Sequence, residues 1–294
     1  MKLWEIFLAT IYNLFARVII HQKKLLPFEQ FLSKAYTLLD ENSISKLKHY
    51  TKSQMHETGF FKDKAGKPDL YYSLFGYFIA SSLKENILKQ KLAEAISNMP
   101  IDSLKDKVHL FCGAILKAQL NSEKESNKKY KLKIIETLNN LSTKDSGYIW
   151  FLGIISFYYL QDYYLINKYL KKFQPQIDTS KEEIPCTLIA AELILNKVNK
   201  KPTQTLVEKL IKYYRPSGGF AALQKSPIED LLSTAVCLFA LQFASVDLRI
   251  IKPDALTFIE SLYHDGGFVA TQFDKEADIE YTFYGLLAMA SLEK

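Results

Sequence analysis

The chain has 294 residues, 48% of them hydrophobic, so it can bury a large core as one domain or two small ones. Its net charge of +6 comes from Lys and Glu interleaved along the sequence. The densest basic stretch, residues 124–133, is typical of a solvated helix face and comes with no nucleic-acid motif, so we expect no nucleic-acid partner.

Three cysteines, Cys112, Cys186 and Cys237, lie far apart in apolar stretches. They form no CxxC pair and their number is odd, which argues against a disulfide scaffold. We interpret them as reduced thiols of a cytoplasmic protein. The 18 Tyr and 19 Phe suit a packed core and equally suit a cavity for an apolar ligand, and both interpretations stay open.

The N-terminal stretch from Leu3 to Ile20 is mostly apolar but is interrupted by Glu5, Asn13 and Arg17. Its uninterrupted part is too short to span a bilayer, and no small-residue cleavage site follows it. We predict a helix that docks on the fold, and a helix lying on a membrane surface through residues 1–20 is the alternative. With a second helix near residues 28–40, residues 1–42 would pack on or cap the remainder of the chain.

One phrase occurs three times in the sequence. It reads TGFFKDKAGKPDLYYSLFG from Thr58, SGGFAALQKSPIEDLLSTAVC from Ser217 and DGGFVATQFDKEADIEYTFYG from Asp265. Each copy is a Gly-aromatic turn, a polar loop, an acidic residue and a helix that opens near Ser or Thr. A repeated phrase indicates repeated architecture.

The helix that closes each phrase carries a reference residue followed three positions later by a small one, which we expect to let helices pack closely. Three clear pairs and three weaker ones fit this pattern: Ser73 with Gly76, His109 with Cys112, Trp150 with Gly153, Thr187 with Ala190, Thr234 with Cys237, and Thr282 with Gly285. An amphipathic helix is predicted before each, at residues 44–52, 83–97, 128–141, 161–173, 203–214 and 255–263.

Helices that are apolar all round are enclosed, whereas amphipathic helices face solvent on one side. Six of each kind predict an all-α fold with two concentric rings, a single (α/α)6 toroid over residues 43–294. An open solenoid of helix pairs is the alternative. The apolar surface on every face of the inner helices favours closure.

The phrase resembles the repeat of protein prenyltransferase β subunits, which squalene and triterpene cyclases share, most strongly over residues 56–83 and 217–292. This resemblance implies a central aromatic cavity that holds an isoprenoid or similar lipid-like molecule. Protein prenyltransferases use an α subunit, which this chain lacks, so the resemblance leaves open whether a protein partner completes the site.

The resemblance places the zinc ligands of protein prenyltransferases at Asp230, Leu232 and Tyr281. Zinc needs thiolate, imidazole or carboxylate donors, and Leu232 offers none. We therefore predict no metal site and no cofactor, and conventional zinc-dependent prenylation is not expected. The arginine that grips diphosphate in the family is replaced by an apolar stretch, which leaves Lys225 as the nearest cation and a candidate substrate contact.

The cyclases protonate their substrate through a DxDDTA motif. Here residues 230–235 read DLLSTA, with Leu232 at the donor position. A leucine has no proton to donate, so this route to cyclisation is closed.

The remaining candidates gather at the predicted openings of the inner helices. Asp69, Asp230 and Asp278 share one offset, where helix capping is the interpretation for the first and last, while a ligand role stays open for Asp230. The candidate catalytic residues are Asp230, Glu280 and Tyr281. An aromatic wall of Tyr72, Tyr148, Trp150 and Tyr281 would contact substrate through cation–π attraction or only fill the barrel.

The sequence thus predicts a prenyltransferase-like or terpene-cyclase-like protein that binds an isoprenoid or other long apolar ligand. Unconventional, metal-independent prenyl chemistry would accompany that binding. The alternative is a non-catalytic binding or interaction module that kept the toroid and lost the site.

Overall fold

The structure is a computed structural model that describes residues 27–97, 99–104, 106–120, 124–141, 147–172 and 183–293. These residues are mostly helical, with thirteen α-helices, two 3-10 helices and four two-residue strands among them. The predicted helix over residues 3–20 lies outside the described residues. No described helix combines the length and hydrophobicity needed to cross a membrane.

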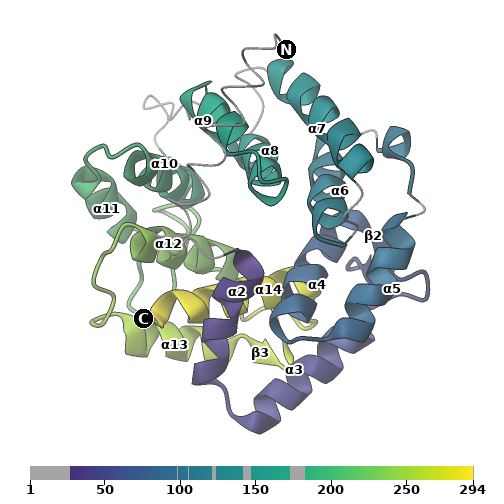
Figure 1. Cartoon of the computed structure of the whole chain (residues 1–294). Coiled ribbons are helices and arrows are strands. Elements are labelled where there is room, and N and C mark those ends of the chain that lie inside the picture. The colour runs from purple at the N-terminus through teal and green to yellow at the C-terminus, as the bar shows by residue number, and fades with distance from the viewer. Residues whose placement is uncertain are drawn as a thin grey trace. The chain divides into compact units, whose positions relative to one another are not determined.

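The six predicted helical hairpins are confirmed (Figure 1). In chain order, an amphipathic helix and an apolar one alternate as follows: α3 (Glu41–Ser53) and α4 (Leu70–Ser82), α5 (Asn86–Ser97) and α6 (Lys107–Leu120), α7 (Lys124–Asn139) and α8 (Gly147–Tyr159), α9 (Tyr163–Lys172) and α10 (Cys186–Val198), α11 (Gln204–Ile211) and α12 (Leu231–Phe243), α13 (Lys252–Ser261) and α14 (Ile279–Leu292).

The chain divides into two compact units. The first unit comprises Met1–Pro27 and Lys89–Gln174, and the second comprises Phe28–Leu88 and Pro175–Lys294. Each is described by itself below. The predicted division of the chain at residue 42 stays a prediction.

In the second unit, the last apolar helix packs against the first one. Helix α14 contacts α12 on one side and α4 on the other, and α12 in turn contacts α10 (Figure 1). An open solenoid keeps its first and last repeats apart, because each repeat contacts only its sequence neighbours. The contact between α14 and α4 therefore contradicts the solenoid alternative.

The three copies of the phrase share one hydrogen-bond pattern. The hydroxyl of Ser73, Thr234 or Thr282 donates to the carbonyl of the aspartate four residues earlier. The same hydroxyl accepts the backbone N–H of the phrase's phenylalanine, at 2.8 Å for Phe61, 2.9 Å for Phe220 and 3.1 Å for Phe268. One side chain thus joins the turn to the helix and satisfies a buried donor.

The first glycine of each phrase adopts a left-handed conformation: φ is +88° at Gly59, +99° at Gly218 and +96° at Gly266. Two of these glycines also touch another backbone. A Cβ on Gly218 would lie 2.0 Å from the Asp254 carbonyl oxygen, and one on Gly266 would lie 2.4 Å from that of Lys46. Glycine is required there both for its φ and for the close approach.

The small residue of the apolar helix was expected to contact a neighbouring helix. In two phrases it contacts a different group. A Cβ on Gly76 would meet the Phe61 ring at 2.4 Å, and one on Gly285 would meet the Phe268 ring at 2.6 Å. These glycines therefore seat the phenylalanine of their own phrase and not a neighbouring helix. Gly153 follows the prediction, because its Cβ would meet Leu138 of α7 and Phe111 of α6.

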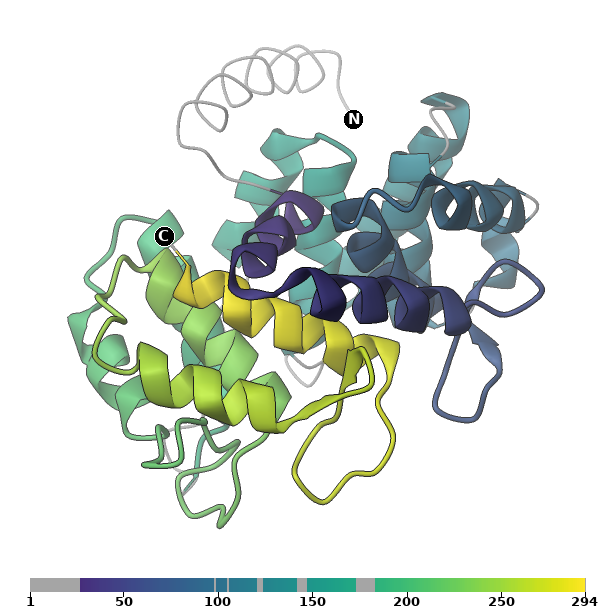
Figure 2. The ribbon, with the colours of Figure 1, turned by 90° about the horizontal axis from the view of Figure 1, so that it is seen from below.

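The turns and loops of the phrases contain the strands that the helical pattern did not reveal. β1 (Phe61–Lys62) pairs with β2 (Pro68–Asp69), and β3 (Tyr263–His264) pairs with β4 (Gly267–Phe268), both antiparallel. The three polar loops project from the same side of the second unit, at the bottom of Figure 2.

The helix predicted near residues 28–40 is present over residues 28–38, in two parts. The chain forms a short α2 (Phe28–Leu32) and then a 3-10 helix, η1 (Ser33–Leu38). The hydroxyls of Ser33 and Thr37 each donate to the carbonyl three residues earlier. Such local bonds compete with the α-helical pattern and accompany its tightening.

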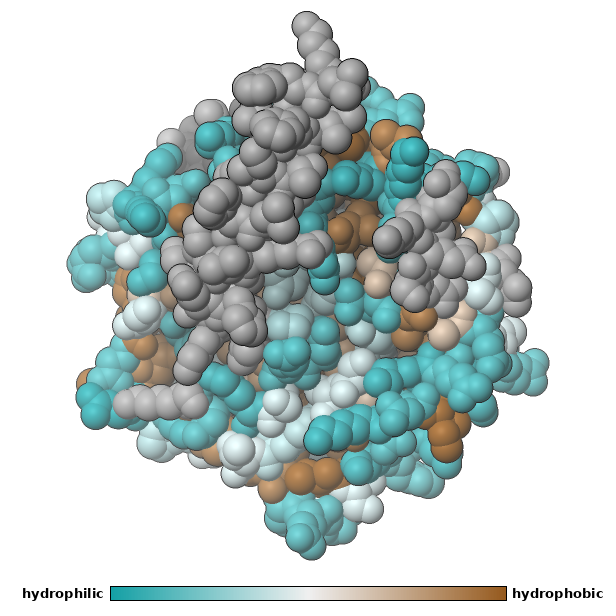
Figure 3. Space-filling view, viewed as in Figure 1, coloured by the Kyte–Doolittle hydropathy of each residue, from teal (hydrophilic) through white to brown (hydrophobic). Residues whose placement is uncertain are grey.

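On the face seen in Figure 3, hydrophilic residues are interspersed with separate hydrophobic patches. This distribution agrees with the interleaved charges of the sequence.

Candidate functional site

The candidate site lies where α4, α12 and α14 begin, all in the second unit. Each of these helices is capped by the aspartate of its phrase. Asp69 accepts from the backbone N–H of Tyr72 at 2.9 Å, Asp230 from that of Ser233 at 2.7 Å, and Asp278 from that of Tyr281 at 2.8 Å. Capping is thus confirmed for all three, Asp230 included.

Glu280, in the first turn of α14, is the centre of the site. The Tyr71 hydroxyl of α4 donates to Glu280 Oε1 at 2.6 Å, and Tyr72 lies close enough to this carboxyl to influence its pKa. Burial raises the pKa of Glu280, the negative charge of Asp278 adds to that effect, and the tyrosine donors and Lys64 oppose it. The site therefore holds a carboxyl that takes up a proton more readily than an exposed glutamate does.

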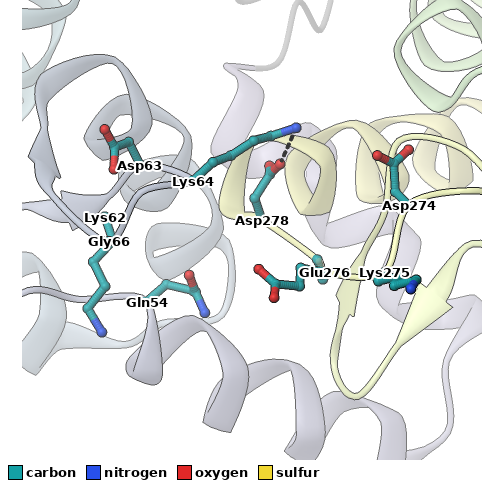
Figure 4. Close-up of a pocket in the computed structure, with 10 residues that line it drawn as sticks. Gln54, Lys62, Asp63, Lys64, Gly66, Asp274, Lys275, Glu276 and Asp278 are labelled. Atoms are coloured by element: carbon teal, nitrogen blue, oxygen red, sulfur yellow. Dashed lines mark ion pairs between the residues drawn. The ribbon is translucent and has the colours of Figure 1, made fainter.

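Lys64 connects the loop of the first phrase to the start of α14. Its Nζ lies 3.2 Å from Asp278 Oδ2 and 4.9 Å from the centre of the Tyr281 ring (Figure 4). Burial raises the pKa of Asp278, while the N–H of Tyr281 and the charge of Lys64 oppose this rise. Lys64 thus pairs with the buried Asp278 carboxylate from the solvent side, because the Lys64 side chain is 56% exposed.

The three predicted catalytic residues are neighbours in the second unit. The pKa of Tyr281 is raised to about 12, by burial first, then by the negative charge of Glu280, and then by that of Asp230. Burial also raises the pKa of Asp230, against the hydrogen bonds that Asp230 accepts at the start of α12. Glu280 and Asp230 therefore both act electrostatically on Tyr281.

The predicted substrate contacts separate into two groups. Tyr72 belongs to the site, and burial together with the charges of Glu280 and Asp278 raises its pKa. Lys225 lies exposed in the loop before α12. Tyr148 and Trp150 belong to α8 in the first unit, and their contact with substrate stays a prediction.

An aromatic row leads away from Glu280 through the second unit. Tyr71 contacts Phe75 with ring centres 4.8 Å apart and a near-perpendicular geometry. The following steps are Phe75 to Phe283 (5.0 Å), Phe283 to Phe78 (5.7 Å), Phe78 to Phe28 (5.5 Å) and Phe28 to Phe239 (6.0 Å). We call these six residues the aromatic row; its rings come from α2, α4, α12 and α14, at separations typical of favourable aromatic pairs.

A polar pocket of about 460 Å³ adjoins the start of α14 (Figure 4). It lies between the loops of the first and third phrases. Its charged lining residues are Lys62, Asp63, Lys64, Asp274, Lys275, Glu276 and Asp278. The site thus has a charged side, a carboxyl–tyrosine centre and an aromatic side.

The residues at the zinc positions of protein prenyltransferases do not fit zinc. Asp230 caps α12, Leu232 is a hydrocarbon, and Tyr281 offers a phenol whose pKa is raised to about 12. Among the described residues, no group of three or more His, Cys, Asp or Glu side chains could hold a metal ion.

The sequence did not reveal Lys64 as a site residue, and it placed Tyr71 at the offset of Glu280 without giving it a role. Both lie in the first phrase, whereas their partners Asp278 and Glu280 lie in the third. The signal for Tyr71 is its offset, because it stands two residues before the reference Ser73 as Glu280 stands two before Thr282. Lys64 lies in the polar loop, where the repeat gives no such offset.

The whole pattern is that of one protein family. Residues 19–105 and 156–294 match the family model for the prenyltransferase alpha-alpha toroid domain. Because the match covers most of the chain, this protein belongs to that family, as the resemblance of the phrase implied. No curated protein and no solved structure matches the sequence.

Proposed function

We propose that this protein binds an isoprenoid or another long apolar chain along the aromatic row, with the polar end of the ligand at Glu280. The observation that carries the proposal is the position of Tyr71. Its hydroxyl is hydrogen-bonded to Glu280 while its ring packs edge-on against Phe75. A polar contact and an apolar surface thus adjoin at one residue, as an amphiphilic ligand needs.

Removal of its apolar surface from water would favour the binding of a hydrocarbon chain along the aromatic row. Each buried CH₂ of a ligand contributes about 0.8 kcal/mol. Phe75, Phe78 and Phe283 are buried, whereas Tyr71, Phe28 and Phe239 are half-buried, so both ends of the row approach the surface of the second unit. A chain that displaces Phe28 would exchange one set of apolar contacts for another.

The proposal extends to chemistry at the polar end. Glu280 is the residue suited to proton transfer, because burial raises its pKa toward neutral pH. Tyr281 and Asp230 would position the reacting group beside it. No step of this unconventional prenyl chemistry uses a metal ion.

The second candidate function is a non-catalytic binding or interaction module. Two observations favour it: Asp230 is engaged as a helix cap, and Phe28 and Phe31 of α2 already pack against Phe239. In this function the aromatic row would be filled by the protein's own side chains, and a protein partner would bind elsewhere on the toroid.

Isothermal titration of the full chain with farnesol, a prenyl alcohol, separates the two functions. We expect saturable binding by the wild-type chain and a loss of about tenfold in affinity for Phe283→Leu, because that ring lies between Phe75 and Phe78. The matched control is Phe157→Leu, whose ring is equally buried but stacks on Tyr169 of α9. An absence of farnesol binding by the wild-type chain would overturn ligand binding and favour the module.

Membrane contact through residues 1–20 and a cytoplasmic location are further proposals. They rest on the apolar N-terminal stretch and on the three cysteines. Flotation with phosphatidylcholine–phosphatidylserine liposomes, with and without residues 1–22, tests the contact. Equal flotation of both proteins would contradict it.

A further inference from the structure

The charge at the polar end of the site restricts the head group that a ligand can carry there. Glu280 and Asp278 lie on the first turn of α14 and at its cap, and Asp230 is close enough to act on Tyr281. Lys64 is the cation that contacts this group, and it is already paired with Asp278 at 3.2 Å. The described residues of the site therefore carry an excess of negative charge.

Each of the three helix starts is already occupied by a carboxylate of the protein itself. A phosphate group normally binds a helix N-terminus through unpaired backbone N–H groups and the positive end of the dipole. Here the carboxylates of Asp69, Asp230 and Asp278 each accept one of those N–H groups and place a negative charge at the positive end of the dipole. Each of the three helices thus contains its own anion.

The charged residues of the pocket beside α14 do not offset the negative charge of the site. Three of its charged residues are cationic and four are anionic: Lys62, Lys64 and Lys275 against Asp63, Asp274, Glu276 and Asp278. Lys62 donates to the Ser53 carbonyl at 2.8 Å, and its ammonium points away from Asp278 (Figure 4). Asp63 is also occupied, because it accepts the backbone N–H groups of Ala65 and Lys67.

From this geometry we propose that the ligand's head group carries no negative charge and donates a hydrogen bond to Glu280, as a long-chain alcohol or amine does. A diphosphate is excluded as the preferred head group. The inference rests on the proposed function, and it names the substrate class of the same site. It follows from like-charge repulsion and from the aspartate caps that already occupy the helix starts.

The raised pKa values of the carboxyls support this inference. Burial raises the pKa of both Glu280 and Asp278, so the site already holds negative charge at a cost in free energy. A diphosphate would add to that charge. A hydroxyl or ammonium group would instead give Glu280 a further donor beside Tyr71.

The test compares three ligands that share one hydrocarbon chain: farnesol, farnesylamine and farnesyl diphosphate. They are titrated calorimetrically into the full chain at pH 7 and low ionic strength. We expect farnesol or farnesylamine to bind at least about tenfold more tightly than the diphosphate. Equal binding of all three ligands, or tighter binding of the diphosphate, overturns the inference and leaves the proposed function standing. Binding of none overturns the proposed function itself.

Two variants test which residue discriminates between a diphosphate and an alcohol or amine head group. Glu280→Gln keeps the shape of the side chain and removes its charge, so it should shift the preference about tenfold toward the diphosphate. Glu208→Gln is the control, because Glu208 is an exposed residue of α11 that hydrogen-bonds Gln204. An unchanged preference in Glu280→Gln, or an equal shift in Glu208→Gln, contradicts the assigned role of Glu280.

Discussion

The starts of α12 and α14 are built on the same frame and differ in what surrounds it. Both have a capping aspartate, a threonine hydroxyl that joins the turn to the helix, and a left-handed glycine. At α14 the cap is paired with Lys64 and adjoins Glu280 and two tyrosines of α4. At α12 the residue that corresponds to Glu280 is Leu232.

This difference separates architecture from chemistry. The frame satisfies backbone groups and fixes the turn, so both repeats need it for stability. Polar side chains gather at α14 because α4 brings Tyr71 and Tyr72 there. The repeat therefore explains the fold, and the residues between its fixed positions decide where a ligand is recognised.

The largest effect is expected where the frame allows no Cβ. Gly218→Ala and Gly266→Ala should each destabilise the protein by about 3 kcal/mol or more, since both have positive φ and lie against another backbone. Gly66→Ala is the control, with φ +78° and no atom within 4 Å of its Cβ, and should cost about 1 kcal/mol. Urea denaturation measures all three, and equal losses would contradict the close-approach argument.

A smaller loss of stability is expected from removing the joining hydroxyl. Thr234→Val and Thr282→Val should each cost about 2 kcal/mol, because the buried N–H of Phe220 or Phe268 loses its acceptor. Thr257→Val removes a hydroxyl that bonds only locally, to Pro253, and should cost under about 0.5 kcal/mol. If Thr234→Val and Thr282→Val lost clearly different amounts of stability, the hydroxyl would not have the same role at α12 and α14.

The comparison also predicts a pH dependence. A carboxyl whose pKa is higher in the folded than in the unfolded protein binds its proton more tightly when folded. Stability therefore falls as pH rises from the ordinary value of 4.5 for Glu280 through its raised value. Glu280→Gln should flatten this part of the curve of unfolding free energy against pH. A curve that is unchanged, or steeper, would contradict the raised pKa.

The smallest expected effect is on the pKa of Glu280, and it distinguishes the two capping aspartates, Asp278 and Asp230. Asp278→Asn should lower the pKa of Glu280, because the charge of Asp278 is one of the causes that raise it. Asp230→Asn should leave that pKa in place, since Asp230 acts on Tyr281 and not on Glu280. Carbon-13 NMR titration of the glutamate carboxyls distinguishes the two, and equal shifts would remove the contrast between α12 and α14.

Much of the fold could be predicted because its signals are local. Apolar residues at helical spacing located the six hairpins, and the fixed offset of Ser73, Thr234 and Thr282 located the turns. The change from α2 to the 3-10 helix η1 was missed because the apolar pattern locates a helix but does not distinguish α from 3-10 geometry.

The site could be predicted only in part, because its contacts are long-range. Tyr71 and Glu280 stand 209 residues apart in the sequence, and only the packing of α4 on α14 brings them together. The seating of Phe61 and Phe268 on Gly76 and Gly285 was missed for a related reason. A small residue indicates that another group packs closely against it, but the sequence does not identify that group.

Native mass spectrometry of the purified full chain, with elemental analysis for zinc, tests the central claim most directly. Spectra are recorded before and after incubation with farnesol. We predict a one-to-one farnesol adduct on a protein without stoichiometric zinc. Stoichiometric zinc, or a chain that takes up no farnesol, would contradict it.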